Sequence, residues 1–257
     1  MDMSFFETIP IYLLYISITL FILLSFEIGF RIGKHTSAPF TKEGSGALGP
    51  MVGGILGMLA FVLAFTFSMV ASHHDHRKLN VLDDANAIST AYLRADLAEE
   101  PHRTEIKRLL KAYVDVLLQR KPDKESVKKL MIGSAELQRL IWAQVLSASK
   151  ENPGANSGLL IRSVNNMFDM HQKRMTTALR NRIPGRIWVT LFVISCLTMI
   201  TLGVQAGISK WRRLVAVIPL ALAFAALATV IVDLDRPLSG VIQVGQEAMI
   251  DLQGRMN

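Results

Sequence analysis

Cysteine is almost absent from this chain of 257 residues, because Cys196 is the only one. Neither an intrachain disulfide nor a cysteine metal site is therefore possible. Charged residues are also scarce. They make up 19% of the sequence, below the roughly 25% that is usual in soluble domains, whereas apolar residues make up 51%. Runs with the alternating pattern of strands are nearly absent as well, so the composition favours a helical membrane protein.

The signatures of enzymes are missing too. The sequence contains no phosphate-binding loop, no HExxH metal motif, no nucleophile elbow and no convergent pair of acids. The net charge of +7 is explained by basic residues beside membrane spans, where they meet anionic headgroups. No groove pattern of aromatic and basic residues indicates nucleic-acid binding. The sequence predicts a protein that is not an enzyme, needs no cofactor and binds no nucleic acid.

Long apolar runs are what the chain does have. We predict four membrane spans from them, each close to the length that a helix needs to cross a bilayer: residues 9–30, 49–72, 187–206 and 214–232. The first eight residues are acidic rather than basic, and no small-residue cleavage site follows the first run. We therefore expect a retained anchor and not a signal peptide.

The predicted fold class is all-α, a multi-pass membrane protein with a helical insert between spans two and three. The expected parts are a transmembrane hairpin (1–72), a helical soluble insert (73–185), a second hairpin (186–232) and a C-terminal tail (233–257). An even number of spans puts both termini and the insert on the same side. Basic residues near the spans do not decide which side that is, because both sides carry them.

Helical periodicity runs through the insert, and we expect the second span to continue into its first helix without a break. Three further helices are predicted at about 101–120, 124–149 and 158–182. One apolar stripe with spacings of three and four should line the buried face of the first helix: Leu82, Ala85, Ile88, Ser89, Tyr92 and Leu93. A second such stripe lies on the next helix: Ile106, Leu109, Leu110, Tyr113, Val114 and Leu117. The four helices form either a small bundle or, as we prefer, a stalk packed between subunits.

One face of the second span is unusual for a helix that meets only lipid. Small residues lie at its ends and aromatic rings between them, at spacings of three and four: Gly53, Gly57, Phe61, Phe65, Ser68 and Ser72. This pattern has two interpretations. Gly53-x-x-x-Gly57 is typical of close helix packing, whereas Phe61 and Phe65, repeated around a symmetry axis, would form rings that gate a pore by dewetting. Aromatic edges are the positive part of the ring quadrupole, so such a pore would tolerate an anion better than a cation.

Directly after this span comes the sequence His73-His74-Asp75-His76-Arg77. Imidazoles and a carboxylate can bind zinc or sense pH. On a helix, however, only His73 and His76 share a face, and metal ligands must converge. We therefore predict no metal site here and interpret His73, His76 and Arg77 as the wetter mouth of the pore.

Charged residues also flank the first and last spans. Asp233, Asp235 and Arg236 follow the last span, and we expect them to form structural pairs with each other or with Arg77, Arg94 or Arg186. A calcium site would need more oxygen ligands than this cluster offers. Glu27 lies four residues before Arg31, and a simple i,i+4 ion pair is expected there.

With these residues, the chain resembles a family of bacterial four-span membrane proteins of unknown function that is called bestrophin-like. The resemblance is strongest at residues 63–68, 84–94 and 233–240. More distantly it resembles bestrophins, which are pentameric anion channels with a helical cytosolic region between spans two and three. That resemblance implies a pore lined by the second span, a neck at Phe61 and Phe65, and termini and insert in the cytoplasm.

The functional prediction is a homo-oligomeric, pentameric ion channel of a bacterial inner membrane that passes small inorganic anions such as chloride. Its expected partners are further copies of the chain, membrane lipid and the permeating anions. The alternative is a membrane assembly or sensory protein whose helical insert binds a partner, with the glycine face only packing the spans together.

Overall fold

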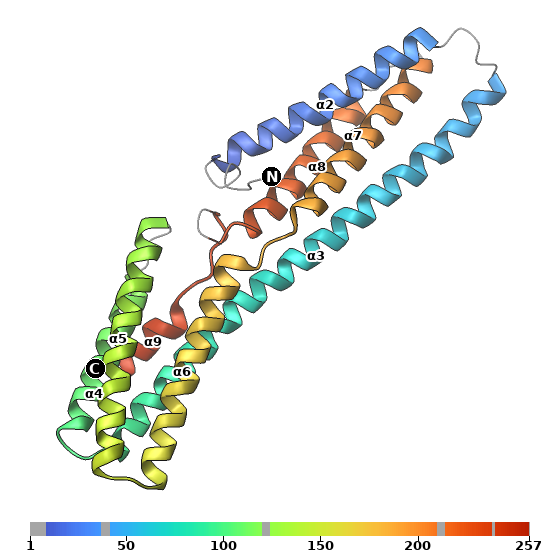
Figure 1. Ribbon diagram of the computed structural model, residues 1–257. Coiled ribbons are helices and arrows are strands. Elements are labelled where there is room, and N and C mark those ends of the chain that lie inside the picture. Colours follow the sequence, from blue (N-terminus) through green and yellow to red (C-terminus); the bar gives the residue numbers. More distant parts are fainter. Residues whose placement is uncertain (1–8, 37–41, 120–123, 210–213, 238–239, 257) are drawn as a thin grey trace. The chain divides into compact units, whose positions relative to one another are not determined.

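The computed structural model describes residues 9–36, 42–119, 124–209, 214–237 and 240–256. Within these ranges the chain is helical, and no strand is present (Figure 1). The helices, labelled as in Figure 1, are α2 (Ile11–Thr36), α3 (Lys42–Arg94), the 3₁₀ helix η1 (Ala95–Leu97), α4 (His102–Leu118), α5 (Lys124–Glu151), α6 (Ala155–Arg180), α7 (Gly185–Ile208), α8 (Leu214–Leu234) and α9 (Glu247–Met256).

Four of the described helices are long and apolar enough to cross a membrane, which confirms the predicted fold class. They cover Ile11–His35, Gly49–Leu97, Gly185–Ile208 and Val215–Leu234. The prediction that the second span continues into the insert is also confirmed, because α3 is one helix of 53 residues. At 1.5 Å per residue it is about 80 Å long, whereas a hydrocarbon core is only about 30 Å thick. A large part of α3 must therefore lie outside the bilayer.

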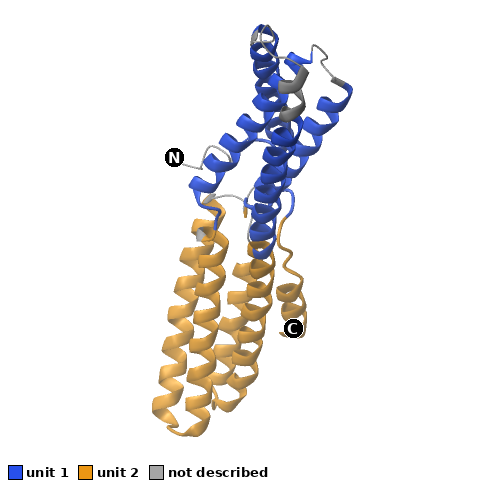
Figure 2. Cartoon of the chain, turned by 90° about the vertical axis from the view of Figure 1, so that its right-hand side faces the viewer, with its two compact units in different colours: residues 1–72, 182–236, 240–242 blue, residues 73–181, 237–239, 243–257 orange. Residues whose placement is uncertain are grey.

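The chain divides into two compact units, which Figure 2 colours separately. Unit 1 contains residues 1–72, 182–236 and 240–242, so it holds α2, α7, α8 and the first part of α3. Its largest buried cluster joins α3 to α7 and α8: Leu59, Leu63, Val70, Ile183, Leu191, Ile231 and Leu234. The packing of these side chains gives α3 one fully buried face within unit 1.

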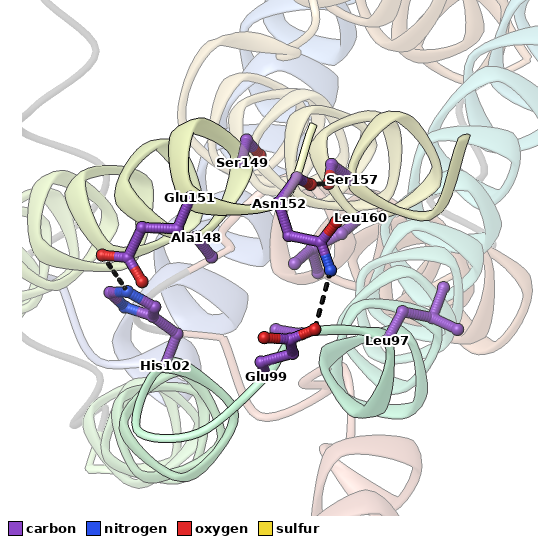
Figure 3. Close-up of a pocket in the computed structure, with 10 residues that line it drawn as sticks. Leu97, Glu99, His102, Ala148, Ser149, Glu151, Asn152, Ser157 and Leu160 are labelled. Carbon is purple, nitrogen blue, oxygen red and sulfur yellow. Dashed lines mark hydrogen bonds and ion pairs between the residues drawn. The ribbon is translucent and has the colours of Figure 1, made fainter. Parts of the chain in front are cut away.

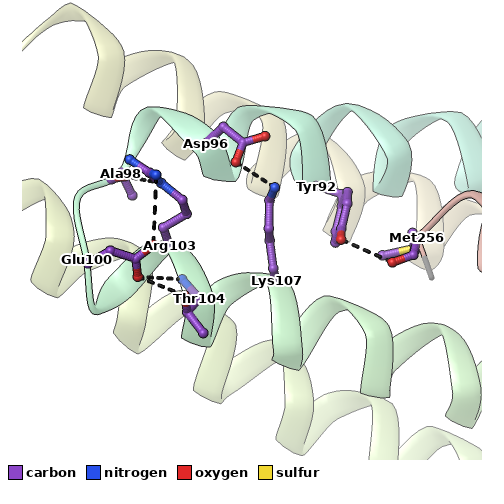
Figure 4. Close-up of polar contacts among 8 residues, drawn as sticks. All are labelled: Tyr92, Asp96, Ala98, Glu100, Arg103, Thr104, Lys107 and Met256. Carbon is purple, nitrogen blue, oxygen red and sulfur yellow. Dashed lines mark hydrogen bonds and ion pairs between the residues drawn. The ribbon is translucent and has the colours of Figure 1, made fainter.

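Unit 2 contains residues 73–181, 237–239 and 243–257. It holds the rest of α3 together with η1, α4, α5, α6 and α9 around one apolar core. The six apolar residues predicted for the stripe of α4 are all buried there. Helix α9 was not predicted from the sequence. This helix buries Met249, Leu252 and Met256, and Tyr92 donates a hydrogen bond of 3.2 Å to the carbonyl of Met256 (Figure 4).

The buried face of α3 in unit 2 differs from the predicted stripe. Ala85 and Ile88 are buried as expected, but Leu82 and Leu93 are 46% and 66% exposed. Asp84, which was expected on the charged outer face, is completely buried. The prediction was wrong at these three positions because α3 carries apolar residues on two faces, and periodicity alone does not tell which face is covered.

Candidate functional site

The predicted pore face of α3 is exposed along its whole length in unit 1. Phe61 and Phe65 are 72% and 59% exposed, and the two serines of the set, Ser68 and Ser72, are exposed too. A side chain added at Gly53 or at Gly57 would meet no atom within 4 Å. The arrangement leaves a helix face of small, aromatic and hydroxyl side chains with no covering from the described part of the same chain.

The opposite face of the same span is covered. Leu59, Leu63 and Val70 have 0 to 2% of their surface exposed and contact side chains of α7 and α8. Thr66 is also buried, and its hydroxyl donates a hydrogen bond of 2.7 Å to the carbonyl of Val62. This span is therefore two-sided. Uniform contact with lipid would not require such a division.

The glycines that bring helices into close contact lie elsewhere in unit 1. A Cβ atom added at Gly29 would lie 2.1 Å from the carbonyl oxygen of Ile200, and one at Gly203 would lie 2.2 Å from that of Phe26. Gly33 and Gly207 repeat these contacts one turn further along. Two small-xxx-small motifs, on α2 and on α7, thus pack backbone against backbone. Sequence reasoning singled out only the motif at Gly53, although the same four-residue spacing was visible at these glycines.

The residues after the span differ in their exposure. His76 is exposed, His73 is partly buried, and Arg77 is 6% exposed. Among the residues that the structure describes, no three His, Cys, Asp or Glu side chains lie close enough together to hold a metal ion. The two histidines and Arg77 therefore offer charge and hydrogen bonds at this part of α3, and no described metal centre.

The acidic residues at the end of α8 accept hydrogen bonds from backbone amides within unit 1. The two carboxylate oxygens of Asp233 accept hydrogen bonds of 2.8 and 2.9 Å from the amides of Val241 and Ile242. Asp235 accepts one of 3.0 Å from the amide of Ile183, just before α7. An isolated buried carboxylate is costly, and these bonds offset the cost of burying Asp233 and Asp235, both 4% exposed.

The turn that these carboxylates hold is closed by Gly240. A Cβ atom there would lie 2.7 Å from the carbonyl oxygen of Asp233 and 2.9 Å from that of Arg236, so only glycine fits without movement of the backbone. Arg236 is 5% exposed and donates a hydrogen bond of 2.9 Å to the carbonyl of Ile9, just before α2. Asp235 and Arg236 thus fasten the end of α8 to the chain just before α7 and just before α2.

Comparison with known proteins decides the family. The sequence model of the Bestrophin-like domain family matches residues 19–249. The chain belongs to the Bestrophin-like family. No curated protein matches the sequence.

Two solved structures share the fold of this Bestrophin-like chain. One is described as a membrane protein with a proline-to-alanine substitution; it has a TM-score of 0.59 and 13% identity, and the match covers 96% of each chain. The other is a bacterial bestrophin homolog from Klebsiella pneumoniae with an isoleucine-to-threonine mutation. Its TM-score is 0.55 at 12% identity, and the match covers 96% of this chain and 98% of the other. At these identities the similarity shows the fold alone.

Within this Bestrophin-like chain, unit 2 contains a buried polar cluster that sequence reasoning missed. Arg174 of α6 donates a hydrogen bond of 2.9 Å to Asp84 of α3 and one of 3.2 Å to Gln246, just before α9. The Nδ1 atom of His171 lies 3.9 Å from the same carboxylate oxygen, and its ring meets that of Tyr113 edge-on at 5.7 Å. Burial and the charge of Asp84 raise the pKa of Tyr113 well above its usual range, so its hydroxyl stays protonated.

In this cluster the carboxylate of Asp84 meets Arg174 and His171 of α6, which in turn contact Gln246 and Tyr113. Asp84 is in the motif 84–88 that carried the family resemblance, and it lies one residue before the buried Ala85. The charge in the middle of an apolar face was the signal that could have revealed it. Asp84 therefore lies on the side of α3 that is buried in unit 2, together with Ala85 and Ile88.

Proposed function

We propose that this Bestrophin-like protein is a homo-oligomeric ion channel, a pentamer in a bacterial inner membrane, that passes small anions such as chloride. In each subunit α3 lines the pore with Gly53, Gly57, Phe61, Phe65, Ser68 and Ser72. The observation that carries the proposal is the exposed face formed by these six residues on a span whose other face is buried.

A phenylalanine that faces lipid would be exposed in the same way, so the exposed face within the span does not by itself indicate a pore. The part of α3 outside the membrane supplies a second observation. In unit 2, α3 presents Leu79, Leu82 and Leu93 with 53%, 46% and 66% of their surface exposed. Leu82 follows Leu79 by three residues and Leu93 follows Leu82 by eleven, about three helical turns, so the three leucines share one face of α3. Because α3 is far longer than a bilayer is thick, this part meets water unless another protein covers it. Neighbouring copies of the chain are the coverage that the family resemblance favours.

The proposed pore has an apolar constriction and a polar mouth. Phe61 and Phe65 lie one turn apart, so around a symmetry axis they form two aromatic rings that gate by dewetting. No Asp, Glu, Lys or Arg occurs from residue 49 to residue 72, and the positive ring edges favour an anion. Beyond the rings, Ser68, Ser72 and His76 supply hydrogen bonds to an ion that is regaining its water shell.

In the proposed channel both termini and unit 2 lie in the cytoplasm, an orientation that the resemblance to bestrophins supports. Lipid contacts the outward surfaces of the spans, and no cofactor or catalytic step is required. Arg77 and the histidines then lie at the cytoplasmic end of the proposed pore, where they attract anions toward the mouth.

A second function is favoured by the surface of α5. This helix carries four large apolar residues whose surfaces are 47%, 64%, 36% and 37% exposed: Met131, Ile132, Leu140 and Leu146. Such exposure is unusual for a helix outside a membrane. In this alternative the protein is an assembly or sensory protein, and α5 binds a partner. The exposed face of α3 then only packs subunits together.

Recording from the purified protein in planar bilayers under a chloride gradient distinguishes the two functions. We expect discrete currents that reverse close to the chloride equilibrium potential. Reversal close to the cation potential would retain the pore and contradict the proposed selectivity. Silence at several pH values and calcium concentrations, from protein that is shown to be folded and inserted, would favour the partner-binding alternative.

A further inference from the structure

His102, the first residue of α4, lies between two oxygen acceptors in unit 2. Its Nε2 is 3.0 Å from a carboxylate oxygen of Glu151, and its Nδ1 is 3.0 Å from the side-chain oxygen of Gln144. Both acceptors are on α5. Only 12% of the imidazole side chain is exposed, so water does not replace either partner freely.

This geometry suits the doubly protonated ring. A neutral imidazole has one N–H and one lone pair, whereas the imidazolium ion donates from both nitrogens. With an oxygen at each nitrogen, only the charged form makes both hydrogen bonds. If the proton leaves Nδ1, the amide of Gln144 can turn over to donate to that nitrogen, and Nε2–H can still donate to Glu151, but the ion pair between the imidazolium and the carboxylate is lost.

Among the described residues, the small pocket beside His102 contains no Lys or Arg in its lining. The lining comes from the ends of η1, α4, α5 and α6 and the residues between them, and its other charged side chains are Glu99 and Glu151 (Figure 3). The nearby cations are directed elsewhere. Arg103 donates to the carbonyl of Ala98 and lies 3.8 Å from Glu100, and Lys107 lies 2.5 Å from Asp96 (Figure 4).

A second bond joins the same two connections without a titrating histidine. Asn152, between α5 and α6, donates a hydrogen bond of 2.9 Å to Glu99, between η1 and α4 (Figure 3). The side chain of Ser157 also binds the carbonyl of Asn152, which braces the start of α6. The bond between Asn152 and Glu99 therefore does not depend on the protonation of a histidine, whereas the bond between His102 and Glu151 does.

We propose that His102 and Glu151 form a pH-sensitive clasp that fastens the first residue of α4 to the last residue of α5, beside the connections from α3 to α4 and from α5 to α6. The clasp closes when His102 is protonated and opens when it is neutral, while the bond between Glu99 and Asn152 keeps the two connections near each other. This device concerns unit 2 alone and does not depend on ion conduction.

The direction of the pH effect follows from the environment of the ring. The hydrogen bonds that His102 donates to Glu151 and, to a lesser extent, to Gln144 raise its pKa above the ordinary value of 6.5, against the smaller opposing effect of burial. A raised pKa in the folded state means that the stabilisation is complete below the unfolded pKa. It is lost as the pH rises through the folded pKa, so the clasp closes on acidification.

Hydrogen–deuterium exchange of the full-length protein in detergent tests the clasp. Peptides that cover residues 95–104 and 148–160 are followed from about pH 5.5 to about pH 8.5, with exchange corrected for its intrinsic pH dependence. We expect several-fold slower exchange of both peptides at the acidic end. His102→Gln and Glu151→Gln should each remove this difference.

Glu136→Gln is the matched control. Glu136 is on α5 like Glu151, but it pairs with Arg139 on the surface, and that pair holds the pKa of its carboxyl below the usual range. This variant should keep the pH-dependent protection. Protection that does not change with pH in the wild type, or that keeps its pH dependence in Glu151→Gln, would overturn the proposal. Glu151→Gln also answers the question if His102→Gln fails to fold.

Discussion

A single phenylalanine tests the proposed pore most directly. Phe65 is 59% exposed on the Gly/Phe/Ser face of α3, whereas Phe67, on the same helix, is 38% exposed and lies on a different side. If Phe65 forms part of the constriction, Phe65→Ala widens it and removes apolar surface, which lowers the cost of wetting the pore. We expect single-channel conductance to rise several-fold and rectification to change.

The control for this variant is Phe67→Ala, which removes the same side chain from the same span. It should leave conductance and rectification as in the wild type. Equal effects of the two substitutions would indicate a general disturbance of α3, and no effect of Phe65→Ala would contradict its place in the constriction.

Arg174 and Lys173 are neighbours on α6, but Arg174 forms a buried ion pair and Lys173 forms an exposed one. The Arg174 side chain is 6% exposed and bound to Asp84, which has no exposed side-chain surface. The Lys173 side chain is 51% exposed and lies 3.2 Å from Asp83. Arg174→Met leaves a buried carboxylate without its cation, a change that costs about 3–5 kcal/mol. Lys173→Met removes a surface pair that contributes about 0–1 kcal/mol.

Thermal unfolding in detergent measures this difference. We expect a clear loss of stability for Arg174→Met and almost none for Lys173→Met. Adding Asp84→Asn to Arg174→Met should recover part of the loss, because the buried charge is then removed. If the two single variants melt alike, the buried pair does not stabilise unit 2 in the way that the geometry indicates.

The contact between α2 and α7 is an element-level feature that glycine alone permits. A Cβ atom at position 203 would lie 2.2 Å from a backbone oxygen, so Gly203→Ala must push the helices apart. Overpacking of this kind costs about 1–3 kcal/mol. Gly54 of α3 has no atom within 4 Å of a built Cβ. Gly54→Ala should therefore be neutral or slightly stabilising, since alanine favours a helix.

The same unfolding assay separates these outcomes. A lower Tm for Gly203→Ala, with no decrease for Gly54→Ala, is the expected result. The reverse order would mean that the close packing of the chain depends on α3 and not on α2 and α7.

The helices themselves were predictable because their apolar spacing is local information. The stripe on α4, from Ile106 to Leu117, was predicted residue by residue and is buried as expected. What the sequence does not contain is the partner of each face. Gly29, Gly203 and Gly53 are each followed by a second glycine four residues later. Only the structure shows which of these pairs meet the backbone of another helix. Leu82 and Leu93 were wrongly assigned to the core because their spacing does not tell which face of α3 is covered.

For the candidate site, the sequence identified the face of α3 but not the buried cluster behind it. Asp84 and Arg174 lie 90 positions apart, so no local pattern joins them. The helix α9 escaped notice because it is short and contains only three buried apolar residues, Met249, Leu252 and Met256. Long-range pairing and short docked segments are set by tertiary contacts, which periodicity does not record.

At the scale of the whole molecule, assembly should depend on the exposed leucines that α3 carries in unit 2. Leu93 is 66% exposed, and in the proposed oligomer a neighbouring copy covers it. Leu93→Glu would place a charge in that contact, where desolvation makes it costly. We expect the variant to dissociate into smaller species, measured by light scattering after size-exclusion chromatography in detergent, while helix content is retained.

Ile132→Glu is the matched control, since Ile132 of α5 is 64% exposed but lies on a different helix. If copies of the chain meet along α3, this variant should assemble as the wild type does. Disassembly by Ile132→Glu and not by Leu93→Glu would move the interface to α5. A wild-type protein that is monomeric in several detergents would favour the alternative, in which α5 binds a different protein. The proposed channel would be supported if the wild-type protein forms a five-fold particle and Leu93→Glu dissociates it. The exposed face of α3 would then lie near the symmetry axis, which is the geometry that a pore requires.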